Sequence, residues 1–244
     1  MKPSPLFSTV ASGEKYYDDV NKATLKGVSI KTFILLGIAV VVSILTAVFL
    51  PTILESNPSG LYIALVVSSI VGFISVMIGR FSERASKYCG CIYAVCEGLF
   101  IGTLSRIVEE LLPGASYIAV FSTLIIYFIV LALFSMGIVK PSTGFRKFAI
   151  AICFSALALV LFTSIFNIFM PIQNIGVLIA IEAFLLFYGV ITLILNFMEA
   201  NQIVEAGCSK NSEWCVALGM TVSLIYIYIE ILRLIVLIAA SNRD

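Results

Sequence analysis

The chain has 244 residues, of which 61% are hydrophobic and 12% are charged, whereas a soluble domain carries roughly 45–50% apolar and about 25% charged residues. A water-soluble fold of this length cannot bury so much apolar surface, which excludes an ordinary soluble protein. The net charge of +1 comes with basic residues confined to short segments, and this pattern argues against a nucleic-acid partner.

The first 31 residues are more polar than the rest of the chain and are rich in lysine. No small-residue cleavage site follows the first apolar run, so we expect that run to remain as a membrane anchor and not to be a signal peptide. Residues 14–31 mix charged side chains with apolar ones such as Tyr16 and Val20. This mixture is compatible with an amphipathic helix on the membrane surface or with a disordered tail. We assign residues 1–31 to a cytoplasmic N-terminal tail.

Seven apolar segments are long enough to cross about 30 Å of hydrocarbon as helices, which takes about twenty residues each. In chain order they are residues 32–50, 61–79, 88–104, 117–139, 148–169, 175–197 and 214–240. Polar or turn-forming breaks separate them. The sequence therefore predicts an all-α membrane protein, a seven-helix transmembrane bundle over residues 32–240, with a short C-terminal tail at 241–244.

Basic residues gather on one side of the predicted bundle, in the tail and in the breaks after the second, fourth and sixth spans. They are Lys2, Lys15, Lys22, Lys26, Lys31, Arg80, Arg84, Lys87, Lys140, Arg146, Lys147 and Lys210. The opposite side holds only Arg106 and Arg243. Because basic loops stay in the cytoplasm, we expect the N-terminus to be cytoplasmic and, with an odd number of spans, the C-terminus to be outside.

Missing residue types exclude several kinds of chemistry. The chain has no histidine, which is the commonest metal ligand and general base, and Cys89, Cys91 and Cys96 lack the paired spacing of a zinc site. No lysine follows Lys210 to hold a retinal, no glycine-rich nucleotide loop is present, and no aspartate falls within a span. We therefore expect no metal site, no cofactor and no enzymatic activity.

Acidic side chains inside the apolar spans are the strongest candidates for function, because a charge at the centre of a membrane helix costs roughly 2.5–3.5 kcal/mol. Glu97 lies near the middle of the third span and Glu182 in the outer half of the sixth. Neither has a basic residue within reach on its own helix. Each must be protonated, bonded to a neighbouring helix or exposed to a wet cavity. A pore or a proton-sensitive switch would use them, and polar contacts between helices are the structural alternative.

Two further pairs lie on the last two spans. Glu230 and Arg233 are three residues apart in the outer half of the last span and share a face, which favours a structural ion pair, with a gating or lining role as the alternative. Asn196 and Glu199 lie less than one turn apart at the cytoplasmic end of the sixth span. We treat these four residues, with Glu97 and Glu182, as candidates for an ion pathway or for proton sensing.

Three motifs stand in the last part of the chain: VEAG at residues 204–207, EW at 213–214 and YIEILRL at 228–234. Together they resemble the closing signature of the Bax inhibitor-1/YccA-like family in its bacterial branch. Others resemble its first and third spans and wider family motifs: GV at 27–28, KT at 31–32, EGLFIG at 97–102, FNIF at 166–169 and NQI at 201–203. The likeness covers nearly the whole chain.

This resemblance implies a seven-helix fold in which a central last helix is wrapped by the other six, in the cell (inner) membrane. Family members are described as pH-sensitive calcium leak channels or as modulators of cell-death and stress responses. Some bacterial relatives bind and restrain a membrane-anchored protease. The resemblance therefore implies Ca²⁺ or H⁺, or a membrane-anchored protease, as partners in the lipid bilayer.

The family's proton sensor is a pair of aspartates, one at the cytoplasmic end of the sixth helix and one in the seventh. The first position falls on or beside Glu199, or on Met198 in an ungapped alignment from Ala206, and the second falls on Ser223. A proton shared between two acids needs both of them, and no carboxylate stands at the second position. Glu230 working with Glu97 is an alternative that rests on acidity and depth alone.

Two functions from different classes follow. The first is a passive pathway for cations, in which acidic side chains attract Ca²⁺ or H⁺ and protonation changes how the last helix packs. The second is a regulatory protein without transport, which acts on a membrane protease or a stress-response complex through its charged tail and cytoplasmic loops. A proton-coupled transporter is disfavoured, because the sequence shows neither internal repeats nor broken helices.

Overall fold

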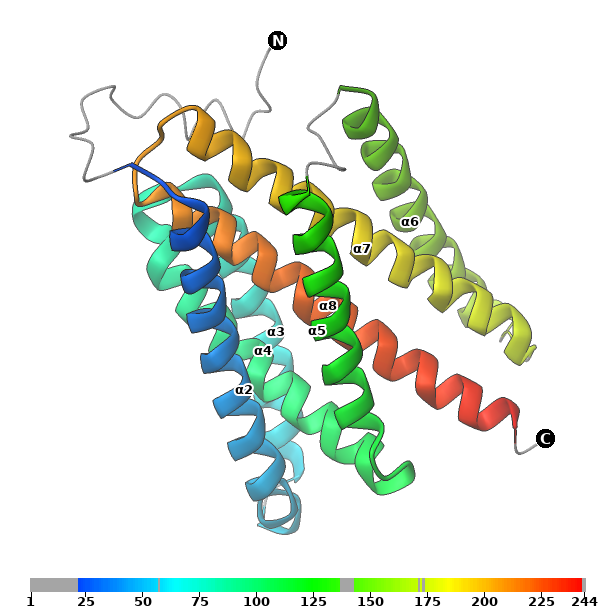
Figure 1. The fold of residues 1–244 in the computed structure, drawn as a ribbon. Coiled ribbons are helices and arrows are strands. Elements are labelled where there is room, and N and C mark those ends of the chain that lie inside the picture. Colours follow the sequence, from blue (N-terminus) through cyan, green and yellow to red (C-terminus); the bar gives the residue numbers. More distant parts are fainter. Residues whose placement is uncertain (1–21, 57, 137–142, 171, 173, 243–244) are drawn as a thin grey trace. The chain divides into compact units, whose positions relative to one another are not determined.

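The computed structural model describes residues 22–56, 58–136, 143–170, 172 and 174–242. These residues form seven helices and no strand (Figure 1). The helices are α2 (Leu25–Ser56), α3 (Pro58–Phe81), α4 (Glu83–Leu111), α5 (Ala115–Ser135), α6 (Thr143–Phe169), α7 (Ile175–Glu205) and α8 (Ser212–Ser241). Each is long and apolar enough to cross a membrane. The prediction of an all-α membrane protein with seven transmembrane helices is confirmed.

Most of the helices are longer than the apolar spans predicted from the sequence. α2 begins at Leu25 instead of residue 32, and α7 continues to Glu205 instead of ending at residue 197. A helix satisfies its own backbone hydrogen bonds, so it continues past the hydrocarbon until turn residues end it. After α7 the turn uses Gly207, whose φ of 63° suits glycine best. Residues 25–31 of the predicted tail are thus helical, whereas its residues 1–21 lie outside the described ranges, as do residues 137–139 and 243–244.

The chain divides into two compact units. Unit 1 comprises Met1–Ile107 and Glu199–Val222, and unit 2 comprises Val108–Met198 and Ser223–Asp244. The described part of unit 1 therefore holds α2, α3, most of α4, the last turns of α7 and the first third of α8. Unit 2 holds α5, α6, most of α7 and the remainder of α8.

In unit 1, α2 and α4 pack closely along glycines of α4. A Cβ added to Gly98 would lie 2.7 Å from Cβ of Val42 and 2.8 Å from the carbonyl oxygen of Ala39. A Cβ added to Gly102, one turn later, would collide with the carbonyl oxygen of Ser43. Small residues four positions apart let two helix backbones approach closely in a membrane. The EGLFIG segment is therefore one place where α4 packs closely against α2.

The last helix is the most buried span. Within its most apolar stretch 44% of the residues are buried, against 11% for α6. Its first part buries Val216, Ala217 and Leu218 in unit 1, and its second part buries Ile227 and Leu232 in unit 2. Exposed apolar side chains cover much of the other helices, as expected for surfaces that face lipid tails. Within each unit, the α8 side chains are therefore among the core residues.

Candidate ion and proton sites

Glu97 lies at the midpoint of α4, which runs from Glu83 to Leu111. Its side chain is half-buried, and the phenol of buried Tyr93, one turn earlier on the same helix, lies within hydrogen-bonding reach of it. The next residue, Gly98, is in the contact with α2. The structure therefore places a hydrogen-bonding group beside Glu97 on its own helix. This partner was not among the three alternatives predicted from the sequence.

Glu199, at the end of α7 in unit 1, forms an ion pair with a residue that the sequence did not single out. Nη2 of Arg80 on α3 lies 2.9 Å from Oε2 of Glu199, and both side chains are mostly buried. Nη1 of Arg80 donates a hydrogen bond of 3.1 Å to the carbonyl oxygen of Cys215, whose thiol donates one of 3.2 Å to the carbonyl oxygen of Arg80. Arg80 thus links α3, α7 and α8. It is 119 positions from Glu199, a separation at which the sequence gives no signal of contact.

Asn196, one turn before Glu199, belongs to unit 2 and contacts the position of the family's second sensor acid. Its amide donates a hydrogen bond of 2.7 Å to the hydroxyl of Ser223. Ser223 in turn donates one of 3.4 Å to Thr192 on α7. Asn196 and Ser223 thus form a neutral polar link between α7 and α8 in unit 2.

Glu182, Glu230 and Arg233 form one charged cluster in unit 2. Nη2 of Arg233 lies 3.3 Å from Oε1 of Glu182 on α7, and Nη1 lies 3.8 Å from Oε1 of Glu230, one turn earlier on α8. Both glutamates are buried, whereas Arg233 is half-exposed. The three-residue spacing predicts the second contact. Of the alternatives for Glu182, the structure shows a partner on a neighbouring helix. Glu97 lies in unit 1 and Glu230 in unit 2, so their cooperation stays a prediction.

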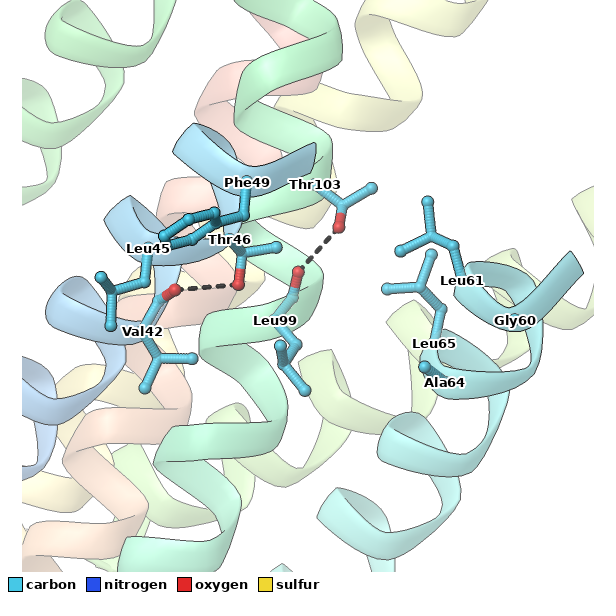
Figure 2. Close-up of a pocket in the computed structure, with 10 residues that line it drawn as sticks. All are labelled: Val42, Leu45, Thr46, Phe49, Gly60, Leu61, Ala64, Leu65, Leu99 and Thr103. Atoms are coloured by element: carbon cyan, nitrogen blue, oxygen red, sulfur yellow. Dashed lines mark hydrogen bonds between the residues drawn. The ribbon is translucent and has the colours of Figure 1, made fainter. Parts of the chain in front are cut away.

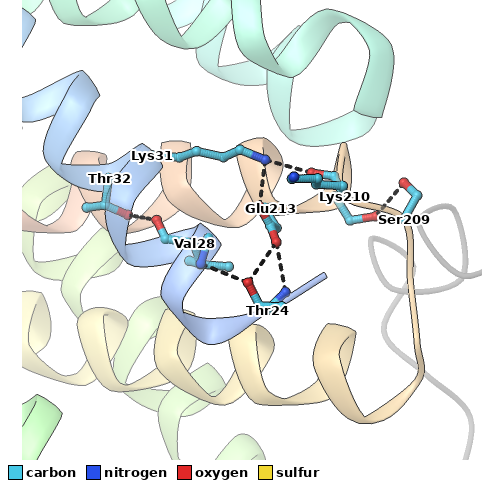
Figure 3. A network of polar contacts seen from close by, with 9 residues as sticks. Thr24, Val28, Lys31, Thr32, Ser209, Lys210 and Glu213 are labelled. Atoms are coloured by element: carbon cyan, nitrogen blue, oxygen red, sulfur yellow. Dashed lines mark hydrogen bonds and ion pairs between the residues drawn. The ribbon is translucent and has the colours of Figure 1, made fainter. Parts of the chain in front are cut away.

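A further buried acid, Glu213 in the first turn of α8, was not singled out from the sequence except within the EW motif. Figure 3 shows that it accepts hydrogen bonds from the start of α2: from the amide nitrogen of Thr24 at 2.8 Å and from its hydroxyl at 3.3 Å. Nζ of Lys31 forms an ion pair with it at 2.6 Å and also donates to the carbonyl oxygen of Lys210. Glu213 is only 1% exposed. We call this set, Thr24, Lys31 and Glu213, the Glu213 clamp.

A comparison with known protein families shows which family the chain belongs to. The chain matches the family described as Bax inhibitor 1 like over residues 4–240, a range that contains α2 to α7 and nearly all of α8. The protein belongs to the Bax inhibitor 1 like family. No curated protein and no solved structure matches the chain. With its seven spans, this Bax inhibitor 1 like protein is an integral multi-pass membrane protein.

The described part of this Bax inhibitor 1 like protein holds no group of three or more His, Cys, Asp or Glu residues that could bind a metal ion. Cys208, in the loop between α7 and α8, is a poor metal ligand as well. Burial, together with the nearby Glu83 carboxylate, raises the pKa of its thiol. The thiol therefore stays protonated at neutral pH, which disfavours it as a metal ligand because metals bind the thiolate.

A cavity of about 440 Å³ opens between α2, α3 and α4 in unit 1 (Figure 2). Ten mostly apolar residues line it, and its two hydroxyls are used within their own helices. Thr46 donates to the carbonyl oxygen of Val42 and Thr103 to that of Leu99, both at 2.9 Å. A cation would find no charged group on this lining. We therefore place the candidate ion sites at the acidic residues and not in this cavity.

Proposed function

We propose that this protein is a pH-sensitive leak pathway for Ca²⁺ or other cations in the cell membrane, with its N-terminus in the cytoplasm. The observation that supports the proposal best is the ion pair between Arg80 and Glu199. Both charges lie in membrane-spanning segments, where isolated charges are costly and usually mark a pathway or a switch. Family membership supports the same reading, since the first sensor position falls on or beside Glu199.

The pair can switch because its two charges act oppositely on a cation. A free Glu199 carboxylate attracts Ca²⁺, whereas a free Arg80 guanidinium repels it, and the ion pair holds the two in balance. Loss of the Glu199 charge would leave Arg80 with its backbone partner, the carbonyl oxygen of Cys215, and with an unbalanced positive charge. The Cys215 thiol is the other titratable group that faces this pair. Removing the Glu199 charge is therefore expected to reduce the leak.

Glu199→Gln should reduce the calcium leak of reconstituted liposomes at least about tenfold, since one charge acts on another at 4 Å with about 4 kcal/mol at an effective dielectric constant of 20. Arg80→Gln should have the opposite effect and increase the leak. Glu97→Gln should also lower it, because it removes an acid from the middle of α4. The measurement is Ca²⁺ entry into dye-loaded vesicles between about pH 5 and about pH 8.

The matched control is Glu205→Gln, an exposed acid two turns further along α7, which should leave the flux unchanged. Vesicles with the native protein that leak no faster than empty ones at every pH would overturn the proposal. So would equal changes in Glu199→Gln and Arg80→Gln, because a pathway that is indifferent to the sign of the remaining charge is not controlled by this pair.

A second candidate is a regulatory membrane protein that binds a membrane-anchored protease or a stress-response complex. Its supporting observation is that the first described residues are fixed to the α7–α8 loop. The amide nitrogen of Ala23 donates a hydrogen bond of 2.9 Å to the carbonyl oxygen of Cys208, and Nζ of Lys31 lies 5.2 Å from the centre of the Trp214 ring. Residues 1–21, which come before this attachment in the chain, carry further charges and are the proposed contact segment.

If the regulatory function is right, removing residues 1–21 should abolish recovery of a stoichiometric partner from native membranes. The deletion leaves Ala23, Thr24 and Lys31 in place, so the attachment to the α7–α8 loop should survive and the fold should be kept. The measurement is affinity purification of the full chain and of the shortened chain from mild detergent. Absence of a stoichiometric partner with both forms would count against this function.

A further inference from the structure

The cluster of Glu182, Glu230 and Arg233 carries an unbalanced charge in its ionised form. Two carboxylates face one guanidinium, at 3.3 Å and 3.8 Å, on helices that span the membrane. Glu182 is 8% exposed and Glu230 is 3% exposed, so water cannot screen the second negative charge well. An uncompensated charge in such surroundings is strongly disfavoured, and a buried carboxylate usually avoids it by binding a proton and becoming neutral.

The hydrogen bonds of the cluster also indicate a bound proton. Each carboxylate uses Oε1 for Arg233, whereas Oε2 of Glu182 and Oε2 of Glu230 are buried and have no hydrogen-bond partner among the described residues. The two carboxyls lie within hydrogen-bonding reach of each other. Two ionised carboxylates are acceptors only, so they cannot bond to each other. One added proton makes one of them a donor and satisfies both.

We propose that Glu182 and Glu230 bind one proton between them, as a shared acid and carboxylate pair held beside the Arg233 guanidinium. The proton comes from water and forms one O–H bond, and no other bond changes. With this proton the cluster has one negative and one positive charge, and both free oxygens gain a partner. The site is distinct from Arg80 and Glu199, which lie in unit 1.

The other titratable groups near this pair are neutral side chains. The phenol of Tyr226 on α8 lies within hydrogen-bonding reach of Glu230, and its ring packs edge-on against that of Tyr188 on α7, with centroids 5.6 Å apart. On α6, the Cys153 thiol lies 3.9 Å from the Tyr188 hydroxyl. A phenol beside Glu230 can donate to a carboxylate, but it does not alter the charge of the cluster. Arg233 is the basic group that the structure places against the two acids.

Infrared spectroscopy of the purified full-length protein at neutral pH tests the inference, because a protonated carboxyl has a C=O band that an ionised one lacks. Glu182→Gln and Glu230→Gln should each remove the same intensity, that of one protonated carboxyl per chain. Either change leaves one acid beside one guanidinium, a balanced pair that needs no proton. The double variant should remove no more than either single one. Arg233→Gln should instead add about one protonated carboxyl per chain, since both acids then lack a counter-charge.

Glu205→Gln, at the exposed end of α7, is the matched control and should leave the band unchanged. A band that survives in both single variants would overturn the inference, because it would show that the proton resides elsewhere. A band lost in only one of them would overturn the sharing. Circular dichroism verifies that the variants are folded, and the two single variants decide the question even if Arg233→Gln does not fold. The measurement needs no ion flux, so it stands apart from the proposed leak.

Discussion

Replacement of Glu213 by alanine should destabilise the protein by about 3 kcal/mol or more, the lower end of the cost of removing one partner from a buried ion pair. The reason is that the Glu213 clamp has one acceptor for several donors. Without its carboxylate, the ammonium group of Lys31 loses its ion pair at 2.6 Å and keeps the carbonyl oxygen of Lys210, and the amide of Thr24 loses its partner at 2.8 Å. The start of α8 also loses an acid in its first turn, where a negative charge favours the helix.

The loss can be measured by denaturant unfolding in detergent micelles, with the fluorescence of Trp214, the sole tryptophan of the chain, as a local reporter. The stability of Glu213→Gln should lie between that of the unaltered chain and that of Glu213→Ala, because glutamine keeps an acceptor for Thr24 and loses the charge opposite Lys31. Glu205→Ala, an exposed acid before the same loop, should change stability by less than about 0.5 kcal/mol. Equal stability of Glu213→Ala and the unaltered chain would show that the clamp contributes nothing.

Gly102→Leu should have a comparable effect through packing, with a cost of about 3 kcal/mol, the upper part of the range for forcing extra volume into a packed interior. A Cβ at this position collides with the backbone of Ser43 on α2, and a backbone carbonyl cannot rotate away as a side chain can. The two helices must therefore separate. We expect a lower midpoint of thermal unfolding and poorer recovery of folded protein from membranes.

Gly37→Leu provides the matched control, because Gly37 lies on α2 with no atom within 4 Å of the position that its Cβ would take. The substitution adds the same side chain to an exposed position, where leucine is a better helix former than glycine. Its stability should equal or exceed that of the unaltered chain. If the two variants lost stability equally, the close approach of α2 and α4 would not explain the effect at Gly102.

The helices could be predicted from the sequence because lipid imposes a simple rule on the chain. Every backbone amide must be paired within its own helix, so length and apolarity alone give the seven spans. The contact of Glu230 with Arg233 was predictable for a similar reason, since two residues three apart on one helix share a face. Local geometry therefore accounts for what the sequence revealed.

Contacts between helices could not be predicted, because they depend on which faces meet. Arg80 was assigned to a basic break, and nothing in its neighbourhood indicates Glu199 as its partner. In the sequence Glu213 is an ordinary acid near the start of a helix. Its partner Lys31 lies 182 positions away along the chain, and only the fold brings the two together. A single sequence carries no signal of such pairs. Only the requirement that a buried charge find a partner told us that they must exist.

An amide and an alcohol neither gain nor lose protons at any acidity that a cell meets. The bond of 2.7 Å from Asn196 to Ser223 therefore has the same strength in acidic and in alkaline surroundings. Two carboxylic acids in the same place would gain or lose a hydrogen bond between them as the acidity changes. In this chain the link between Asn196 and Ser223 therefore does not respond to acidity, and any sensitivity to acid has to come from other residues.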